Sequence, residues 1–543
     1  MVFLPEFATT LPSSNFKFAK ERIADWGRND PRGGGMEEID VEMNVIRDFA
    51  RRVLLSEETF QEDGNTFVNM FSGEWSGTSK LNKYDLSSMY FNYAGSIYSQ
   101  NFPIIDIVMN TMLKQEESTQ GRHFFRMFNG MGDDQRAAAY LNGKSFEQAV
   151  LDNTLSTEVF YEMMKLKGVY LRNYINSRLS SNEFKEFMAE FMKKYQFQEV
   201  NFTRLNSEFI RKFHFNLMDF IPNWYTINST PRFIVKGVDA DQVEIGDYTK
   251  YIVKFQVYNP TNVEGVISVN VEEGGGMFPG GPRGRRGRAA QMESKPAKNY
   301  IIEPRKYKEI RILCDERPSN LTINTNISQN LPSTIMQNFA KVTTTTTDTV
   351  TGIFDSNAAL FTFNPKEITV DNEDPGFRII ESNQKNKLQS FFKKESEDKY
   401  KNLNFWMPPS KWTATIGVNY YGDYINSAVY KKSGSGSNKT EWTTQIQIPG
   451  FYEVFVYTSE LPMMGWRRRG SEEKKMQYYT VKHDDGEEEI SVETGRGRQG
   501  WMTLGSFYFS AGEAKIPLSD KGSESNQIIF ADAVKWVYTN NNK

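Results

Sequence analysis

Residues 165–235 read KLKGVYLRNYINSRLSSNEFKEFMAEFMKKYQFQEVNFTRLNSEFIRKFHFNLMDFIPNWYTINSTPRFIV and change along their length from helical to strand-like patterning. Apolar residues recur every three or four positions as far as Phe213, which is the spacing of amphipathic α-helices. Pro231 then prevents further helix, and Phe233 and Val235 begin the alternation of a β-strand. This stretch therefore predicts three amphipathic helices that lead into a β-sheet domain.

Polar residues between the apolar stretches indicate where two of these helices begin. Ser181 or Asn182 precedes the second stretch, and Asn201 or Thr203 precedes the third. Side chains of these types accept hydrogen bonds from the free backbone N–H groups at a helix start. We therefore expect helix caps at these positions.

The order of these elements resembles the segment that follows the zinc site in the M1 (gluzincin) aminopeptidases. The matching features are Lys167-Gly168, Tyr195-Gln196-Phe197, the helical stretch 202–213, Trp224 and Pro231-Arg232-Phe233. The resemblance implies that residues 1–230 form an M1-peptidase-like helical region. Gly34-Gly35-Met36-Glu37 also resembles the Gly-x-Met-Glu motif of that family, although a glycine turn before an acidic first helical turn is the favoured explanation.

An M1 zinc site needs two histidines one helical turn apart, a glutamate base between them and a glutamate ligand on the next helix. No two histidines of this chain lie within one helical turn of each other; they are His123, His214 and His483. The composition therefore excludes the zinc-binding motif from this chain. We expect no metal, no cofactor and no catalytic residue.

The M1 resemblance implies a degenerate site in place of the zinc ligands. It puts Tyr84 and Ser88 at the histidine positions, Asp85 at the base and Asp106 at the third ligand. These side chains lack the nitrogen donors that bind zinc and activate water. The alternative is that residues 84–113 form an ordinary buried helical hairpin.

Residues 231–366 are predicted to form an antiparallel β-sandwich. Residues 251–257 and 267–271 alternate apolar and polar side chains, so that each strand presents one apolar face. Asn259-Pro260 and the following Asn-Val-Glu-Gly are typical of a hairpin turn. The threonine-rich residues 342–352 favour an extended strand or linker. Cys314 lies in a strand-like run, where a buried, inert thiol is expected.

A Gly/Arg-rich segment, residues 274–291, is inserted between two predicted strands. Its cationic side chains are Arg283, Arg285, Arg286 and Arg288. A glycine- and proline-rich backbone without core-forming side chains predicts a solvated loop. Contact with an anionic surface is the alternative. No aromatic residues interleave with the arginines, so nucleic acid is not favoured as a partner.

Residues 367–543 resemble the golvesin C-terminal domain, which is also described as a xanthan-lyase carbohydrate-binding-like domain. The resemblance is carried, in order, by GVNYYG (417–422), IPGFYEVFVY (448–457), YYTVKHDDG (478–486), GWMTLG (500–505) and ADAVKW (531–536). It implies a second antiparallel β-sandwich, and it implies a glycan as a partner because aromatic faces stack on sugar rings.

Several residues of this last third have an expected place. Trp442, Trp501 and Trp536 fall at motif positions and are expected in the core. Asp532 is expected to be a buried carboxylate that fixes a turn, and His483 to lie at a hairpin tip. Trp466, next to Arg467, Arg468 and Arg469, is the candidate for an exposed ligand contact.

Composition narrows the class of protein. The 543 residues carry a net charge of −3, so no global field favours nucleic acid or a membrane surface. No apolar run reaches the about 18 residues that a transmembrane helix needs. The opening residues MVFLPEFATT do not resemble a signal peptide, so the protein is either cytoplasmic or part of a longer precursor. We favour the precursor, because the M1-like resemblance begins in mid-domain.

The sequence therefore predicts a multidomain α + β protein with a helical M1-like region followed by two antiparallel β-sandwich domains. The leading hypothesis is a non-catalytic binding or scaffolding protein of the bacterial cell envelope, periplasmic or surface-located, with a protein or glycan partner. One alternative is the C-terminal portion of a larger zinc metallopeptidase with catalytic residues outside this chain. Another is an accessory subunit of an envelope secretion or transport complex.

Overall fold

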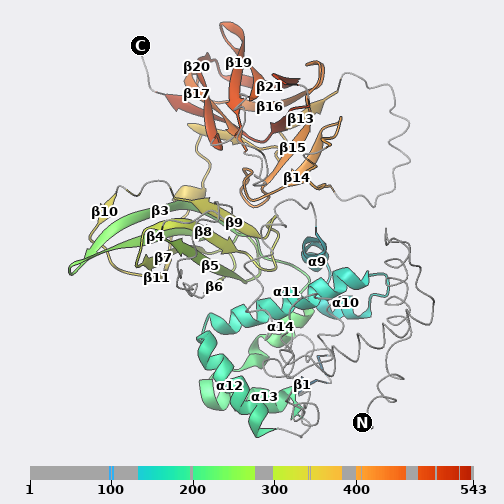
Figure 1. Cartoon of the computed structure of the whole chain (residues 1–543), viewed down its shortest axis with the longest axis vertical. Helices are drawn as coiled ribbons and strands as arrows, with labels where there is room; N and C mark the ends of the chain where they lie inside the picture. Colours follow the sequence, from blue (N-terminus) through green and yellow to red (C-terminus); the bar gives the residue numbers. More distant parts are fainter. Residues whose placement is uncertain are drawn as a thin grey trace, which may run out of the picture. The chain divides into compact units, whose positions relative to one another are not determined.

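The computed structural model describes residues 97–99, 101–102, 132–195, 200–274, 297–339, 342, 344–381, 399–404, 407–459, 475–495, 498–524 and 526–539. β-strands hold more of these residues than helices do, and they form several largely antiparallel sheets (Figure 1). The chain divides into two compact units, Met1–Lys114 with Glu186–Phe215, and Gln115–Lys185 with Asn216–Lys543.

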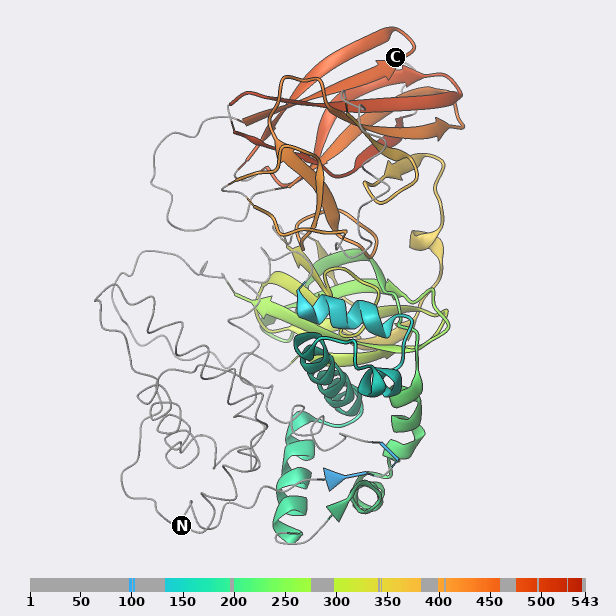
Figure 2. The same ribbon diagram turned by 90° about the vertical axis from the view of Figure 1, so that its right-hand side faces the viewer.

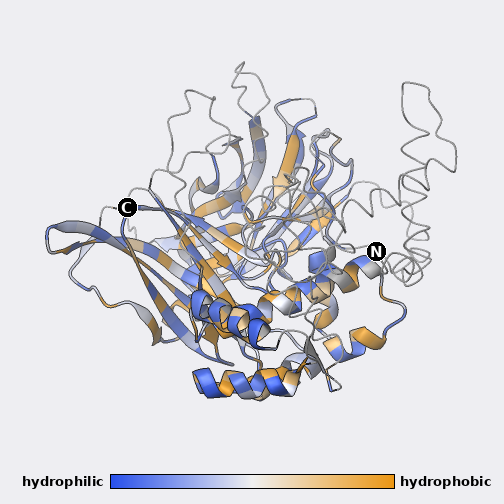
Figure 3. Cartoon of the chain, turned by 60° about the horizontal axis from the view of Figure 1, so that its bottom comes forward, coloured by the Kyte–Doolittle hydropathy of each residue, from blue (hydrophilic) through white to orange (hydrophobic). Residues whose placement is uncertain are grey.

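In the first unit, a small parallel pair of strands accompanies amphipathic helices. The pair consists of β1 (Ile97–Tyr98) and β2 (Val200–Asn201), and the helices are α13 (Phe202–Phe213) and most of α12 (Ser181–Lys194). Phe187 packs edge-on against Phe209 and Phe213, with ring centroids 5.2 and 5.4 Å apart. Helices in Figure 3 carry both hydrophobic and hydrophilic bands, as expected for one buried face.

The predicted helix starts are correct at α13 and wrong by one residue at α12. The Asn201 side chain accepts a hydrogen bond from the Arg204 N–H at 2.9 Å, as predicted. In α12 the capping residue is Ser180. Its hydroxyl accepts a bond from the Glu183 N–H at 3.2 Å, and the Glu183 carboxylate accepts one from the Ser180 N–H at 2.9 Å. Glu183 can make this reciprocal pair only with the residue three positions before it.

The second unit begins with helices that precede two sandwiches. These helices are α9 (Asp133–Leu141), α10 (Phe146–Leu151), α11 (Thr157–Asn176), the 3-10 turn η1 (Leu217–Asp219) and α14 (Ile221–Thr226). Ser145 caps α10 through the Gln148 N–H, and Ser156 caps α11 through the Val159 N–H. The Trp224 side chain is 2 % exposed and donates to the Lys167 carbonyl at 3.3 Å, which ties α14 to α11.

The first sandwich packs two sheets around a shared apolar core. One sheet has the order β10-β3-β4-β7-β11 and the other β6-β5-β8-β9. Their bounds are β3 (Ile234–Ile245), β4 (Tyr248–Tyr258), β5 (Gly265–Glu273), β6 (Lys298–Ile302), β7 (Tyr307–Cys314), β8 (Pro318–Asn324), β9 (Thr334–Asn338), β10 (Thr345–Thr346) and β11 (Gly352–Asp355). Cys314 is fully buried in this core, as predicted.

The hairpin predicted at Asn259-Pro260 is wrong. β4 and β5 lie in different sheets, because the apolar faces of both strands must reach the same core from opposite sides. The buried Asn259 side chain holds this crossing by donating to the carbonyls of Val263 at 2.7 Å and Ile302 at 3.3 Å. The Gly/Arg-rich segment does follow β5 and precede β6, but only Gly274 of it belongs to the described residues.

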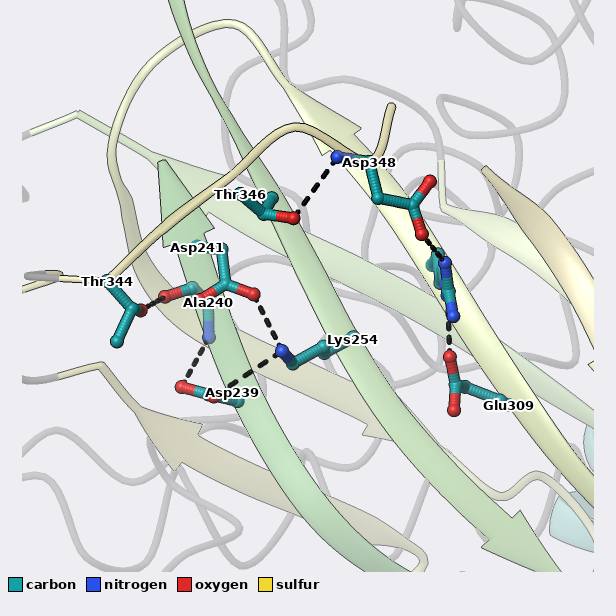
Figure 4. Close-up of polar contacts among 9 residues, drawn as sticks. Asp239, Ala240, Asp241, Lys254, Glu309, Thr344, Thr346 and Asp348 are labelled. Carbon is teal, nitrogen blue, oxygen red and sulfur yellow. Dashed lines mark hydrogen bonds and ion pairs between the residues drawn. The ribbon is translucent and has the colours of Figure 1, made fainter. Parts of the chain in front are cut away.

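The threonine-rich residues form an edge strand, which confirms the expected extended conformation. β10 pairs in parallel with β3, and the Gln242 N–H donates to the Thr344 carbonyl at 2.8 Å. Figure 4 shows the polar contacts around this edge. Lys254 bonds Asp241 at 2.6 Å, and Asp348 pairs with Arg311. The Thr344 hydroxyl also donates to the Ala240 carbonyl at 3.3 Å, so the segment is held by contacts to β3 and β7.

The C-terminal sandwich packs the sheet β12-β23-β17-β20 against the sheet β13-β16-β21-β18-β19, with a smaller sheet β14-β15-β22 (Figure 2). The 3-10 turn η2 (Ala359–Phe361) precedes this sandwich, and its Phe361 packs against Tyr258 and Tyr307 of the first sandwich. The strand bounds are β12 (Glu367–Val370), β13 (Phe377–Ile380), β14 (Thr413–Ile416), β15 (Ser427–Lys432), β16 (Lys439–Ile446), β17 (Gly450–Thr458), β18 (Lys475–His483), β19 (Gly486–Thr494), β20 (Gly500–Phe509), β21 (Gly512–Gly522), β22 (Ile528–Ala531) and β23 (Val534–Thr539). His483 lies at the tip of the β18–β19 hairpin, as predicted.

Candidate functional site

The strand β17 presents aromatic side chains on the face that points away from the core. Tyr452, Val454 and Val456 are fully buried between the two sheets. The alternate residues include Phe455 and Tyr457, which are half-buried on the opposite face. Because successive side chains of a strand point to opposite faces, these aromatic groups are not needed for the core.

Three aromatic side chains meet at one end of this outer face, and we call Tyr421, Tyr457 and Trp501 the aromatic surface. Tyr457 of β17 pairs directly with Trp501 of β20, and their ring centroids lie 5.3 Å apart at 82°. Tyr421, from the loop between β14 and β15, lies 5.1 Å from Trp501 at 66°. All three are half-buried, and such edge-to-face packing fixes ring orientation.

A cation lies against this surface. The Lys535 Nζ of β23 is 4.6 Å from the centroid of the Trp501 ring and 5.5 Å from that of Phe455. It is also 3.5 Å from a Glu367 carboxylate oxygen. The Lys535 side chain is 19 % exposed, so its ammonium is held beside the indole and remains accessible.

Polar groups surround the rings. Thr369 lies next to the Tyr421 hydroxyl, and Gln499 lies next to the Tyr457 hydroxyl. Burial raises the pKa of both tyrosines, so they stay protonated at neutral pH. The Gln499 amide also donates to the Asn419 carbonyl at 3.4 Å. Flat apolar rings therefore lie next to hydroxyl, amide and ammonium groups.

Asp532 holds the loop that carries Tyr421 from its buried side. Its carboxylate is buried, and each oxygen accepts the Tyr421 backbone N–H at 3.2 Å. The Ser459 hydroxyl donates to the same group at 3.1 Å. Asp532 is therefore a buried carboxylate that fixes a turn, as predicted.

The predictions made from the sequence for individual residues of this domain are confirmed in some cases and wrong in one. Trp442 and Trp536 are 1 % and 0 % exposed, so both are core residues as expected. Trp501 is not, because its strand position faces outward and a bulge between Val454 and Phe455 offsets the pairing of β17 and β20. Outside the described residues lie Trp466, Arg467, Arg468 and Arg469, together with Tyr84, Asp85, Ser88 and Asp106.

Sequence reasoning missed Tyr421, Tyr457 and Lys535 as site residues. A signal was available in FYEVFVYTS, where one set of alternate positions contains Tyr452, Val454 and Val456 and the other contains aromatic residues as well. A strand with apolar groups on both faces either is buried on both sides or exposes one of them for binding. Tyr421 and Lys535 gave no such signal, because only the fold brings them to Trp501.

The described part of the chain shows two further properties. It contains no grouping of three or more His, Cys, Asp or Glu side chains suited to a metal ion. None of its helices combines the length and the apolar character that crossing a membrane requires.

Comparisons with known proteins support the C-terminal resemblance. Residues 402–538 match the Golvesin C-terminal domain family. Among solved structures, similarity is found to a Paenibacillus xanthan lyase, with 14% identity over 57% of this chain and a TM-score of 0.23. The chain covers 26% of that enzyme.

A family 35 carbohydrate-binding module from Clostridium thermocellum is also similar, with 12% identity, a TM-score of 0.20, and coverage of 31% of this chain and 98% of the module. No curated protein matches the sequence. The M1 resemblance of residues 1–230 lies outside the matched residues and stays a prediction. The matched residues, 402–538, contain all of the aromatic surface and Lys535, and are thus similar to a Golvesin C-terminal domain.

Proposed function

We propose that the C-terminal sandwich binds a glycan through the aromatic surface. The observation that carries this proposal is the half-buried cluster of Tyr421, Tyr457 and Trp501 on a sheet face that the core does not use. The match of residues 402–538 to the Golvesin C-terminal domain family supports it, together with the sequence resemblance to carbohydrate-binding-like domains.

The chemistry of the surface suits a sugar better than a purely apolar ligand. The C–H faces of a pyranose ring stack on aromatic rings, and its hydroxyl groups need hydrogen-bond partners at the ring edge. Lys535 and Gln499 offer donors there, and Glu367 offers an acceptor. Because the rings are fixed by mutual packing, little conformational entropy is lost on binding.

Affinity electrophoresis of the intact protein through gels containing soluble polysaccharides tests the proposal. A panel of xanthan, galactan, dextran and a pectin samples acidic and neutral chains. We expect retardation by at least one of them, and we expect Trp501→Ala to weaken that binding at least about tenfold, as for an aromatic hot spot.

Tyr508→Ala is the matched control. Tyr508 lies on the same strand, is 37 % exposed and packs edge-on against Phe451 at 5.4 Å, away from the aromatic surface. Its loss should leave the retardation unchanged. Equal retardation of the wild type and Trp501→Ala, or no retardation by any polysaccharide, would contradict the proposal.

We also propose, from the sequence alone, that the chain works at the bacterial cell envelope and that the M1-like region is non-catalytic. A surface or periplasmic place would bring the aromatic surface to extracellular polysaccharide. A protein partner or a scaffolding role for residues 1–230 remains part of this proposal.

A further inference from the structure

Lys167 is a buried cation without a described acidic partner. Its side chain leaves α11, is 3 % exposed and donates to the Trp224 carbonyl. The ammonium lies 5.2 Å from the centroid of the Trp224 ring and 5.7 Å from that of Phe146. Burial lowers the pKa of Lys167 to about 7, and no charged neighbour in the described part of the chain offsets that burial. One carbonyl and two ring faces leave much of its donor capacity unused.

A cavity of about 40 Å³ lies beside this side chain. Lys167, Thr230 and Glu264 contribute its polar groups, and Tyr170, Phe220 and Trp224 contribute ring surface. Thr230 is 3 % exposed, and its hydroxyl finds no hydrogen-bond partner among the described residues. A buried hydroxyl of this kind costs free energy unless a ligand or water pairs with it.

We propose that this cavity binds a small monocarboxylate, of the size of formate or acetate, between Lys167 and Thr230. Buried ammonium groups are stabilised by an opposite charge, and a carboxylate has two oxygens to accept from an ammonium and a hydroxyl together. The volume accepts about three water-sized groups. Formate has three non-hydrogen atoms and acetate has four, which is close to this number.

A substitution of Glu264 tests the sign of the ligand's charge. It lines the same cavity, and burial raises the pKa of its carboxyl group. A carboxylate ligand is repelled by an ionised Glu264, so Glu264→Gln should bind acetate more tightly. A cationic ligand would show the opposite change.

Titration of the intact protein with sodium acetate, with sodium sulfate keeping the ionic strength constant, tests the site by saturation-transfer NMR of the acetate methyl group. We expect saturable binding. Lys167→Met should weaken it at least about tenfold, and Thr230→Val about threefold, because each removes a hydrogen bond to a charged group. Glu264→Gln should strengthen it.

Lys165→Met is the matched control on the same helix, because Lys165 is already paired with Glu162 at 2.9 Å and does not line the cavity. If Lys167→Met fails to fold, the opposite shifts of Thr230→Val and Glu264→Gln decide the question. The proposal is overturned by non-saturable acetate binding, by Lys167→Met or Thr230→Val binding like the wild type, or by weaker binding in Glu264→Gln.

Discussion

Two buried carboxylates, Asp371 and Asp532, interact with each other in the C-terminal sandwich. Burial, and after it the charge of the neighbouring Asp532, raise the pKa of Asp371 to about 9. Burial also raises the pKa of Asp532 well above its usual value. Two like charges in a low-dielectric interior repel each other, so the pair prefers to keep a proton.

We predict that this pair makes the sandwich less stable as the pH rises. Unfolded aspartate loses its proton near pH 4, whereas folded Asp371 keeps it to about pH 9, so the folded state binds more protons between these values. The contribution of Asp371 to the free energy of unfolding is therefore fully present below the pKa of the unfolded aspartate and is lost as the pH rises towards the folded pKa. Asp371→Asn should remove part of the slope and gain about 1–3 kcal/mol at pH 9 relative to pH 5.

Urea unfolding followed by tryptophan fluorescence at several pH values measures this slope. Asp485→Asn, in the exposed turn after His483, is the control and should follow the wild type. A wild-type stability that rises between pH 5 and 9, or an Asp371→Asn variant with an unchanged slope, would show that the pair is not protonated in the folded protein.

Among the elements, the short strand β10 is flanked by side-chain contacts. It contains two residues, and its neighbour Asp348 pairs with Arg311 and accepts the Val350 N–H at 3.0 Å. The Asp348 N–H also donates to the Thr346 hydroxyl at 3.1 Å, as Figure 4 shows. These contacts hold the threonine-rich segment against the edge of β3.

We predict that Asp348→Ala loosens β10 without unfolding the sandwich. The Gln242 amide, which donates to the Thr344 carbonyl, should exchange its hydrogen about two- to fivefold faster, as expected for loss of an exposed ion pair. Hydrogen exchange measured by NMR reports this residue directly. Asp355→Ala, on the opposite edge strand β11, removes the 2.9 Å contact to Lys308 of β7 and should leave Gln242 unaffected. Equal effects of both variants would refute the local model.

The strands of both sandwiches were predictable because they alternate around one core. Val253, Phe255 and Val257 face inward as their spacing indicates. The partner of each strand was not predictable in the same way. The crossing at Asn259 depends on which sheet each strand joins, and the outward position of Trp501 depends on a β-bulge. Neither feature can be predicted from the local alternation of apolar and polar residues.

For the whole molecule, composition excluded one kind of site, and local motifs indicated one domain. The few histidines exclude the M1 zinc motif, and the motifs between Gly417 and Trp536 identified the C-terminal domain that the family comparison also finds. The aromatic surface combines residues from β17, β20 and the loop after β14, and the adjacent Lys535 comes from β23. Because these residues come from four separate segments, no spacing in the sequence could have predicted the site.

We predict that the purified chain contains no bound zinc and has no aminopeptidase activity. The physical reason is the lack of two imidazoles one helical turn apart. Elemental analysis after dialysis, with a panel of aminoacyl-nitroanilide substrates, measures both properties. One equivalent of zinc per chain would contradict the prediction, whatever the activity.

The buried thiol of Cys314 should not react with labelling reagents, which makes site-specific labelling of the protein simple. It is the single cysteine of the chain and lies in the interior of the first sandwich. A maleimide dye should therefore leave the native protein unmodified, since thiols react as exposed thiolates. A cysteine introduced in place of Thr503, which is exposed two positions after Trp501 on β20, would then be the sole reactive attachment point. A fluorophore there would report, by its change in emission, whether a polysaccharide binds at the neighbouring rings.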